Sequence, residues 1–154
     1  MLFGCARPAS SDATVTELLR ADFEPAPGSV PRARRAVLRS LMGRGIERVA
    51  DTTCLLTSEL VTNAVQHAQR SLGVVVDVDA TRVRVEVRDD GKRTPPPLPE
   101  AEKELGSYWL LLLSDLASRW GFEHERSGGG VSWFEVELAE AAPSPRQPTA
   151  CSSS

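Results

Sequence analysis

One stretch of the sequence, from Thr57 to Ala68, combines a carboxylate with two carboxamides at helical spacing. Glu59, Asn63 and Gln66 follow one another at intervals of four and three residues, so on a helix they share one stripe. A carboxylate one turn before a carboxamide offers a proton acceptor beside an oxygen ligand suited to Mg²⁺. An exposed polar edge on an ordinary amphipathic helix would have the same spacing, so the spacing alone leaves both interpretations open.

The helix that must position this stripe is apolar around most of its circumference. We expect it to run from about residue 46 to residue 69, because neither Gly nor Pro interrupts the apolar repeat. A helix this apolar should be buried on nearly every side, and a buried carboxylate without a partner is costly. We therefore expect the stripe to face a polar cavity, filled by water or a ligand, between the helix and a sheet. Cys54 points away from the stripe, and His67 lies just off it. We expect both residues to be structural.

A strand and a shorter helix are expected before it, over residues 14–23 and from residue 29. Ser29 is the expected helix cap, with Pro31 in the first turn, and Gly43 and Gly45 end the helix. The apolar face of this helix consists of Ala33, Val37 and Leu41. Its basic face consists of Arg32, Arg35 and Arg39. In an acidic chain we expect the arginine row to be solvated, with phosphate binding as the alternative.

Two alternating runs predict an antiparallel hairpin with its turn at Ala80 and Thr81. The expected register sets Val78 opposite Val83, Val76 opposite Val85 and Val74 opposite Val87. On the other face it sets Asp77 opposite Arg84 and Asp79 opposite Arg82. One side of the hairpin is thus apolar and the other charged, which is typical of a sheet with one buried face.

The second strand of the hairpin leads directly into Asp89, Asp90 and Gly91. A proline-rich stretch makes residues 92–105 a loop, after which a helix is expected over about residues 108–118. Residues 119–125 and 131–138 then predict a closing strand pair, joined through the glycine-rich turn at 127–130.

The composition predicts one domain in 154 residues, with a net charge of −3. That charge gives no electrostatic argument for nucleic acid or for an anionic membrane. The three cysteines have no metal-ligand spacing, no apolar run reaches the roughly 18 residues of a membrane span, and the amino terminus lacks the features of a signal peptide. We expect a cytoplasmic protein with a domain over residues 14–140 and flexible tails at 1–13 and 141–154.

Three segments in this order resemble the GHKL ATP-binding superfamily, which includes gyrase, histidine kinases and heat-shock chaperones. The most specific segment is Ser-Glu-Leu-Val-Thr-Asn-Ala-Val-x-His-Ala, from Ser58 to Ala68. Val-Arg-Val-Glu-Val-Arg-Asp-Asp-Gly, ending at Gly91, and Leu-Ala-Ser-Arg-Trp-Gly, ending at Gly121, add to it. Within the superfamily the chain is most similar to the small anti-sigma-factor serine kinases and their actinobacterial relatives. The resemblance covers about residues 14–140.

The resemblance implies an α/β two-layer sandwich, with three helices on one face of a mixed, mostly antiparallel sheet and ATP between the layers. Glu59 would be the general base, and Asn63 would coordinate Mg²⁺. Asp89 would accept a hydrogen bond from the adenine amino group, and Gly91 would let the ring approach the backbone. The remaining candidate cofactor-binding residues are Gln66, Gly106, Gly130 and Ser132.

The main departure from the family pattern lies in the phosphate lid. Ser107, Tyr108, Trp109 and Leu110 stand where the family has glycine, arginine, glycine and leucine, with Gly106 just ahead. Arg93 also replaces a second glycine after Asp89. These changes remove backbone donors that a triphosphate needs.

Three functions therefore compete. The first is an ATP-dependent kinase that phosphorylates a serine of a small anti-anti-sigma (STAS-type) protein and/or sequesters a sigma factor, in a family where homodimers are usual. The second is a degenerate module that binds its protein partner and transfers no phosphate. Nucleic-acid binding by the arginine row is the third, which the acidic total disfavours.

Overall fold

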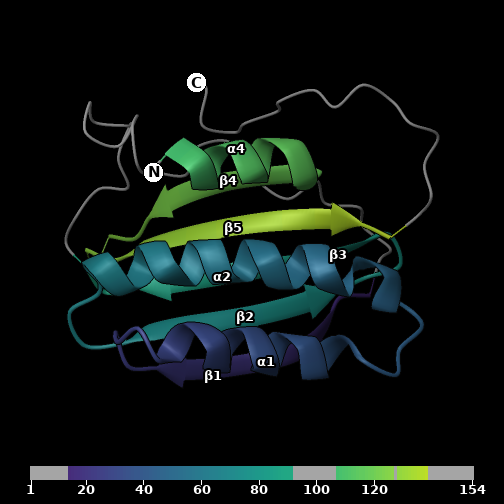
Figure 1. The fold of residues 1–154 in the computed structure, drawn as a ribbon, viewed down its shortest axis with the longest axis horizontal. Coiled ribbons are helices and arrows are strands. Elements are labelled where there is room, and N and C mark those ends of the chain that lie inside the picture. Colours follow the sequence, from purple (N-terminus) through teal and green to yellow (C-terminus); the bar gives the residue numbers. More distant parts are fainter. Residues whose placement is uncertain (1–13, 92–106, 127, 139–154) are drawn as a thin grey trace.

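The computed structural model describes residues 14–91, 107–126 and 128–138 of the chain, and Figure 1 shows how its helices and strands are arranged. In chain order the elements are β1 (Thr16–Phe23), α1 (Ser29–Leu41), the short 3₁₀ helix η1 (Glu47–Val49), α2 (Ala50–His67), β2 (Leu72–Val78), β3 (Arg82–Asp89), α4 (Ser107–Leu116), β4 (Arg119–His124) and β5 (Gly130–Glu137).

The described strands form one sheet in the order β1-β2-β3-β5-β4, and the α-helices of the described residues, α1, α2 and α4, lie side by side on one of its faces (Figure 1). The predicted two-layer α/β sandwich is therefore confirmed. All four pairings among the described strands are antiparallel, in a sheet that was expected to be mixed but mostly antiparallel.

The hairpin of β2 and β3 has the predicted register. Val78 pairs with Val83, Val76 with Val85 and Val74 with Val87. The Asp79 carboxylate closes the turn, because its Oδ1 accepts hydrogen bonds from the backbone N–H of Thr81 at 2.7 Å and of Arg82 at 3.0 Å. The alternation of valines was enough to fix this register, since a slip of one residue would turn every valine away from the core.

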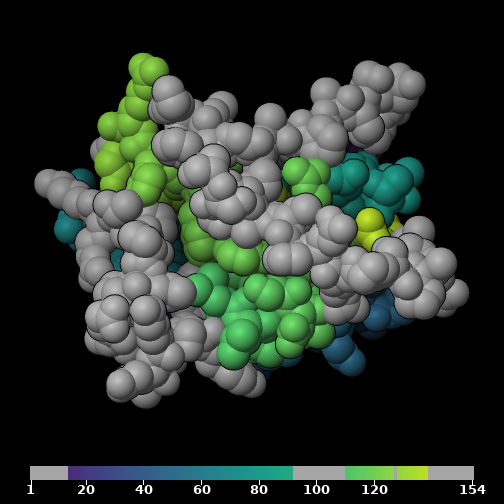
Figure 2. Space-filling view, turned by 90° about the horizontal axis from the view of Figure 1, so that it is seen from above, coloured from purple at the N-terminus to yellow at the C-terminus, as the bar shows by residue number. Residues whose placement is uncertain are grey.

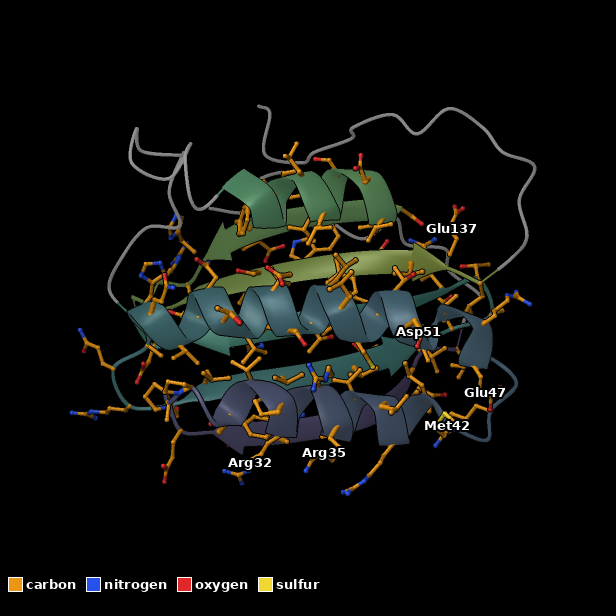
Figure 3. The ribbon with its side chains drawn as sticks, viewed as in Figure 1. Arg32, Arg35, Met42, Glu47, Asp51 and Glu137 are labelled. Atoms are coloured by element: carbon orange, nitrogen blue, oxygen red, sulfur yellow. The ribbon has the colours of Figure 1, made fainter. Side chains whose placement is uncertain are left out.

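Helix α1 packs its apolar face on the sheet and on α2, and its arginines are exposed. Ala33, Val37 and Leu41 are fully buried, as predicted. Arg32 and Arg35 point away from the helix–sheet interface (Figure 3), which is the solvated arrangement that the sequence favoured. Two glycines with φ of +77°, Gly43 and Gly45, end this part of the chain where predicted.

The prediction that Ser29 caps α1 is wrong. The helix begins at Ser29 itself, and Gly28 precedes it in a helical conformation. The Ser29 hydroxyl donates to the carbonyl oxygen of Glu24 at 2.6 Å, so it ties the helix back to the preceding turn. The apolar pattern located the helix correctly, but it could not show which way this hydroxyl points.

The sheet face opposite the helices is also buried at its centre, contrary to the expectation of one buried face. Trp133 is 1% exposed there, and Arg84 and Glu135 are buried beside it. A continuous row of ion pairs, which we call the charged ladder, links side chains at 2.8–3.0 Å. Its members in order are Arg82, Glu135, Arg84, Glu86, Arg88 and Glu125. The charged side chains of β3 therefore form ion pairs within the charged ladder.

Helix α4 forms part of the molecular surface beyond α2 (Figure 2). Its inner side carries Leu113 and is followed by Ala117, which are both buried, while Leu111 is 60% exposed. No helix in the described part of the chain is both long and apolar enough to cross a membrane. The expected tails, at 1–13 and 141–154, lie outside the described residues, so the domain bounds stay predictions.

Candidate functional site

Helix α2 carries the first three candidate residues, Glu59, Asn63 and Gln66. Glu59 and Asn63 are half-buried there, whereas Gln66 is exposed. Two buried hydroxyls of the helix are satisfied locally, because Thr53 and Thr57 each donate to the carbonyl four residues earlier at 2.7 Å, whereas the buried Ser58 hydroxyl has no partner among the described residues. Glu59 and Asn63 lie four residues apart on α2, which is the spacing that a base beside a metal ligand requires. The cavity that we expect beside them stays a prediction.

The end of β3 lies against the end of α2, and a glycine makes this approach possible. A Cβ atom on Gly91 would lie 2.3 Å from the carbonyl oxygen of His67, the last residue of α2. The neighbouring Asp90 fixes the same junction, because its carboxylate accepts hydrogen bonds from the backbone N–H of Gln69 at 2.8 Å and of Arg70 at 3.0 Å. Gly91 therefore has a packing role that no larger residue could take without a backbone shift.

Asp89 is the half-buried carboxylate of this junction and faces the helix layer, two residues after the core residue Val87. Its Oδ1 accepts a hydrogen bond from the Gly91 N–H at 2.9 Å. Burial raises the pKa of Asp89, and this effect exceeds the opposing ones of the Gly91 N–H and the nearby His67. A half-buried carboxylate has lost part of its hydration. A hydrogen bond from a ligand N–H would replace that lost hydration, so Asp89 is well placed to bind such a donor.

Strand β5 brings two more candidates to the same end of the sheet. Gly130 pairs directly with Asp89, and a Cβ atom on Gly129 would lie 2.5 Å from the Asp89 carbonyl oxygen. Ser132 is half-buried two residues further on, on the same face as the core residue Phe134. Asp89, Gly91, Gly130 and Ser132 therefore share one region beneath the helices.

Two parts of the predicted site cannot be placed. Gly106 lies outside the described residues, as do the side chains of Ser107, Tyr108 and Trp109. The backbone of these three residues is the first turn of α4. The sequence change in the lid therefore coincides with the start of a helix that contains no glycine.

The sequence analysis gave no functional role to His67, which the structure brings to the junction. Its ring nitrogens are both buried, and neither has a hydrogen-bond partner among the residues that the structure describes. A Cβ atom on Gly91 would lie close to both the His67 carbonyl oxygen and, at 3.1 Å, the Asp89 Oδ1, so the backbone of His67 lies near that carboxylate. The signal in the sequence was its position four residues after Asn63, which puts it one turn further along the same side of α2.

The donor set fits Mg²⁺ bound through a ligand better than Mg²⁺ in a protein cage. In the described part of the chain, no three His, Cys, Asp or Glu side chains gather as metal ligands. The amide oxygen of Asn63 could supply one ligand, and the rest would be phosphate oxygens and water. This is the usual way in which proteins hold Mg²⁺ at nucleotides.

A two-layer fold with a carboxylate, a carboxamide and close-packed glycines at one sheet end defines a candidate nucleotide-binding protein. Comparison with protein families identifies the class: residues 23–139 match the histidine kinase-like ATPase domain. The chain belongs to this family, and the match supports a GHKL-type ATP-binding domain. A comparison with curated proteins found no match.

Proposed function

We propose that the protein is an ATP-binding regulator that phosphorylates a serine of a small anti-anti-sigma (STAS-type) protein, sequesters a sigma factor, or does both. The observation that carries the proposal is the junction of α2, β3 and β5. There a half-buried Asp89 lies beside Gly91 and Gly130, on the same side of the sheet as Glu59 and Asn63. The family match supports the nucleotide, and the resemblance of residues 58–68 to anti-sigma-factor kinases supports the partner.

Each residue has a role that its chemistry allows. Asp89 accepts a hydrogen bond from the adenine amino group, and Asn63 gives an amide oxygen to Mg²⁺. Glu59 accepts the proton of the attacking serine hydroxyl, and Ser132 can donate a hydrogen bond toward the phosphates. When bound, ATP with Mg²⁺ supplies the phosphoryl group and neutralises its charge. Glu59 is half-exposed, which leaves a partner serine access to it.

The test is calorimetric titration of Mg-ATP into wild-type protein and three variants. Asp89→Asn should bind about 10 to 100 times more weakly, because it loses a charge-assisted hydrogen bond. Asn63→Ala should lose the Mg²⁺-dependent part of the affinity. Glu59→Ala should bind within a few-fold of wild type but lose about 10²–10⁴ in transfer rate. Wild-type protein that binds no Mg-ATP would overturn the proposal.

The folded-state stability of Asp89→Asn provides the control. The pKa of Asp89 is raised in the folded protein, so its ionised form is less favourable there than in the unfolded chain. At neutral pH the carboxylate therefore lowers stability, and stability rises as the pH falls from the folded pKa toward the ordinary one. Asp89→Asn should unfold at no lower denaturant concentration than wild type, which separates lost binding from lost folding.

A binding module that transfers no phosphate is the second candidate, and the glycine-free start of α4 favours it. In that case Mg-ATP binds little better than Mg-ADP, because the lid contributes little at the phosphate end. Phosphate transfer from radiolabelled ATP to a STAS-type protein decides between the two. Partner binding that is equal for wild type and Glu59→Ala, with no transfer by either, would favour the module.

A further inference from the structure

Helix α1 and the turn after it concentrate positive charge in a chain that is acidic as a whole. Between residues 29 and 49 there are six arginines and one acidic residue, Glu47, which is a local net charge of +5 in a chain whose total is −3. The total gives no reason to expect contact with an anionic surface, but electrostatic attraction depends on how charge is distributed over the surface. An anionic partner would therefore be attracted to this part of the molecule.

Neighbouring carboxylates do not neutralise the arginines of α1. Arg34, Arg35 and Arg39 are exposed, and none of them has a salt-bridge partner in the part of the chain that the structure describes. Every arginine of the charged ladder, by contrast, is paired with a glutamate. Helix α1 itself contains no acidic residue, so its outer side stays positively charged.

Two apolar side chains lie among these arginines. Leu38 is 38% exposed, and Met42, the C-cap residue of α1, is 52% exposed. At 3.6 residues per turn they lie between Arg34 on one flank of the helix and Arg35 and Arg39 on the other. Arg35 and Met42 lie along the outer side of α1, away from α2 (Figure 3). We call these five residues the basic ridge.

An apolar centre with basic flanks is typical of helices that lie on a lipid bilayer. The apolar side chains enter the boundary between headgroups and acyl chains, while the arginines on both flanks reach the phosphates. A nucleic-acid backbone is bound by arginines without apolar contacts, so it leaves the exposed leucine and methionine unexplained. An acidic protein helix usually binds in a groove, whereas the basic ridge is the outer side of a single helix.

We propose that the basic ridge binds the surface of a lipid bilayer that contains anionic headgroups. The arginines bind lipid phosphates, and Leu38 and Met42 enter the layer just beneath them. Binding of this kind is peripheral and reversible, and it requires no membrane-spanning helix. The candidate nucleotide site lies elsewhere, at the junction of α2, β3 and β5, so this inference goes beyond the proposed function and does not depend on it.

The test is flotation of the full chain with vesicles of phosphatidylcholine alone and of phosphatidylcholine with about one third phosphatidylglycerol. Wild-type protein should bind the anionic vesicles and not the neutral ones. Each arginine near such a surface contributes about five-fold in affinity, so Arg35→Gln/Arg39→Gln should bind about 25-fold more weakly. Raising NaCl from about 0.1 M to about 1 M shortens the Debye length to about 3 Å and should weaken wild-type binding by about ten-fold or more.

The apolar pair is tested separately. Leu38→Ser/Met42→Ser should bind the anionic vesicles about ten-fold more weakly, because each buried CH₂ contributes about four-fold. Met42→Ser alone, which changes the more exposed side chain of the two, should lose about four-fold. Leu111→Ser is the matched control, because Leu111 is 60% exposed on α4, and it should bind like wild type.

A second control separates local charge from total charge. Arg70→Gln/Arg126→Gln removes the same charge from exposed arginines outside α1 and should bind the vesicles within about two-fold of wild type. All these variants should melt within about 3 °C of wild type, because the changed side chains are exposed. The Mg-ATP titration of Arg35→Gln/Arg39→Gln should match that of wild type, whatever that titration shows, so the two proposals stand or fail separately.

Four results would overturn the inference. The first is wild-type protein that binds neither kind of vesicle or both equally. The second is a control pair that loses as much affinity as Arg35→Gln/Arg39→Gln. The third is a Leu38→Ser/Met42→Ser variant with full affinity, which would mean that charge alone is recognised. The fourth is polyglutamate or duplex DNA that binds more tightly than the vesicles do, which would assign the basic ridge to an acidic protein or to nucleic acid.

Discussion

Strand β3 carries two carboxylates three residues apart whose surroundings have opposite effects on them. Glu86 belongs to the charged ladder: burial opposes its ionisation, but Arg84 and Arg88 outweigh burial and lower its pKa. Asp89 faces the helix layer at the end of the strand, where burial prevails and raises its pKa. One carboxylate has its partners within the protein, and the other has a single backbone donor.

The same contrast extends to the groups around each carboxylate. Every member of the charged ladder is paired with another member at 2.8–3.0 Å. Near Asp89, the ring of His67 has no partner in the described part of the chain. Satisfied polar groups hold the fold together, and unsatisfied ones indicate where a ligand completes it.

The largest expected effect comes from breaking the charged ladder. The Glu135 side chain is 3% exposed and pairs with both Arg82 and Arg84. Glu135→Ala removes this shared carboxylate and leaves both arginines without that partner. Loss of one partner of a buried ion pair costs about 3–5 kcal/mol. Denaturant unfolding should show this loss, whereas the nucleotide affinity of the folded protein should not change.

Glu137→Ala is the matched control, since Glu137 lies on the same strand and face but is exposed (Figure 3). Its free energy of unfolding should stay within about 0.5 kcal/mol of wild type. Equal losses at Glu135 and Glu137 would mean that the buried pairing is not what stabilises this face.

A smaller effect is expected at the junction of α2 and β3. In Gly91→Ala the new methyl group would lie 2.3 Å from the His67 carbonyl oxygen, so the backbone must move. Such overpacking costs about 1–3 kcal/mol. The shift also displaces Asp89 and should weaken Mg-ATP binding, as measured by calorimetry.

Gly28→Ala tests whether this cost is local. A Cβ atom at Gly28 would meet nothing within 4 Å, and its φ of −65° suits any residue. Its stability should lie within about 0.5 kcal/mol of wild type, with unchanged affinity. A Gly91→Ala variant as stable as Gly28→Ala would contradict the close approach of β3 to α2.

The smallest effect is expected at Asp90, the neighbour of Asp89. Its bonds from the backbone N–H groups of Gln69 and Arg70 lower its pKa. A lowered pKa contributes stability that is present above the ordinary value of about 3.9 and is lost as the pH falls through the folded pKa. Asp90→Ala should therefore cost about 1 kcal/mol at pH 7, as loss of a helix cap does, and progressively less below about pH 4.

Urea unfolding at pH 7 and at pH 3 would measure this difference. Asp90→Asn, which keeps an acceptor oxygen, should lose less than Asp90→Ala at pH 7. A gap between wild type and Asp90→Ala that is the same at both pH values would show that the carboxylate charge contributes nothing.

The sequence was most informative where apolar residues recur with the period of a strand or of a helix. The valines of β2 and β3 fixed the register residue by residue, and Ala33, Val37 and Leu41 fixed the inner face of α1. In both cases the hydrophobic effect acts on a period that the backbone imposes. The candidates Asp89, Gly91 and Gly130 were named from motifs, and strand pairing brings Asp89 and Gly130 together.

Features that depend on neighbours distant in sequence were not predictable in this way. The sequence predicted that the charged face of β3 is exposed to solvent. It could not show that Glu135 pairs with Arg82 and Arg84, because Glu135 lies more than 50 residues away along the chain. A helical wheel put Gln66 on the functional stripe and His67 just off it. The structure leaves Gln66 exposed and places the His67 backbone against Gly91, at the junction of α2 and β3.

The pairing of β3 with β5 has a consequence for how the protein acquires function as it folds. Asp89 lies opposite Gly130, so the 40 residues between them must close into a loop before the two can meet. Closing such a loop is entropically costly, and contacts of this kind form late and slowly in folding. Competence to bind a nucleotide should therefore appear only once β5 has paired with β3. A chain that ends before β5 would still contain the residues of α1, α2 and the β2–β3 hairpin. It would lack Gly130 and Ser132, and with them the β5 part of the candidate site.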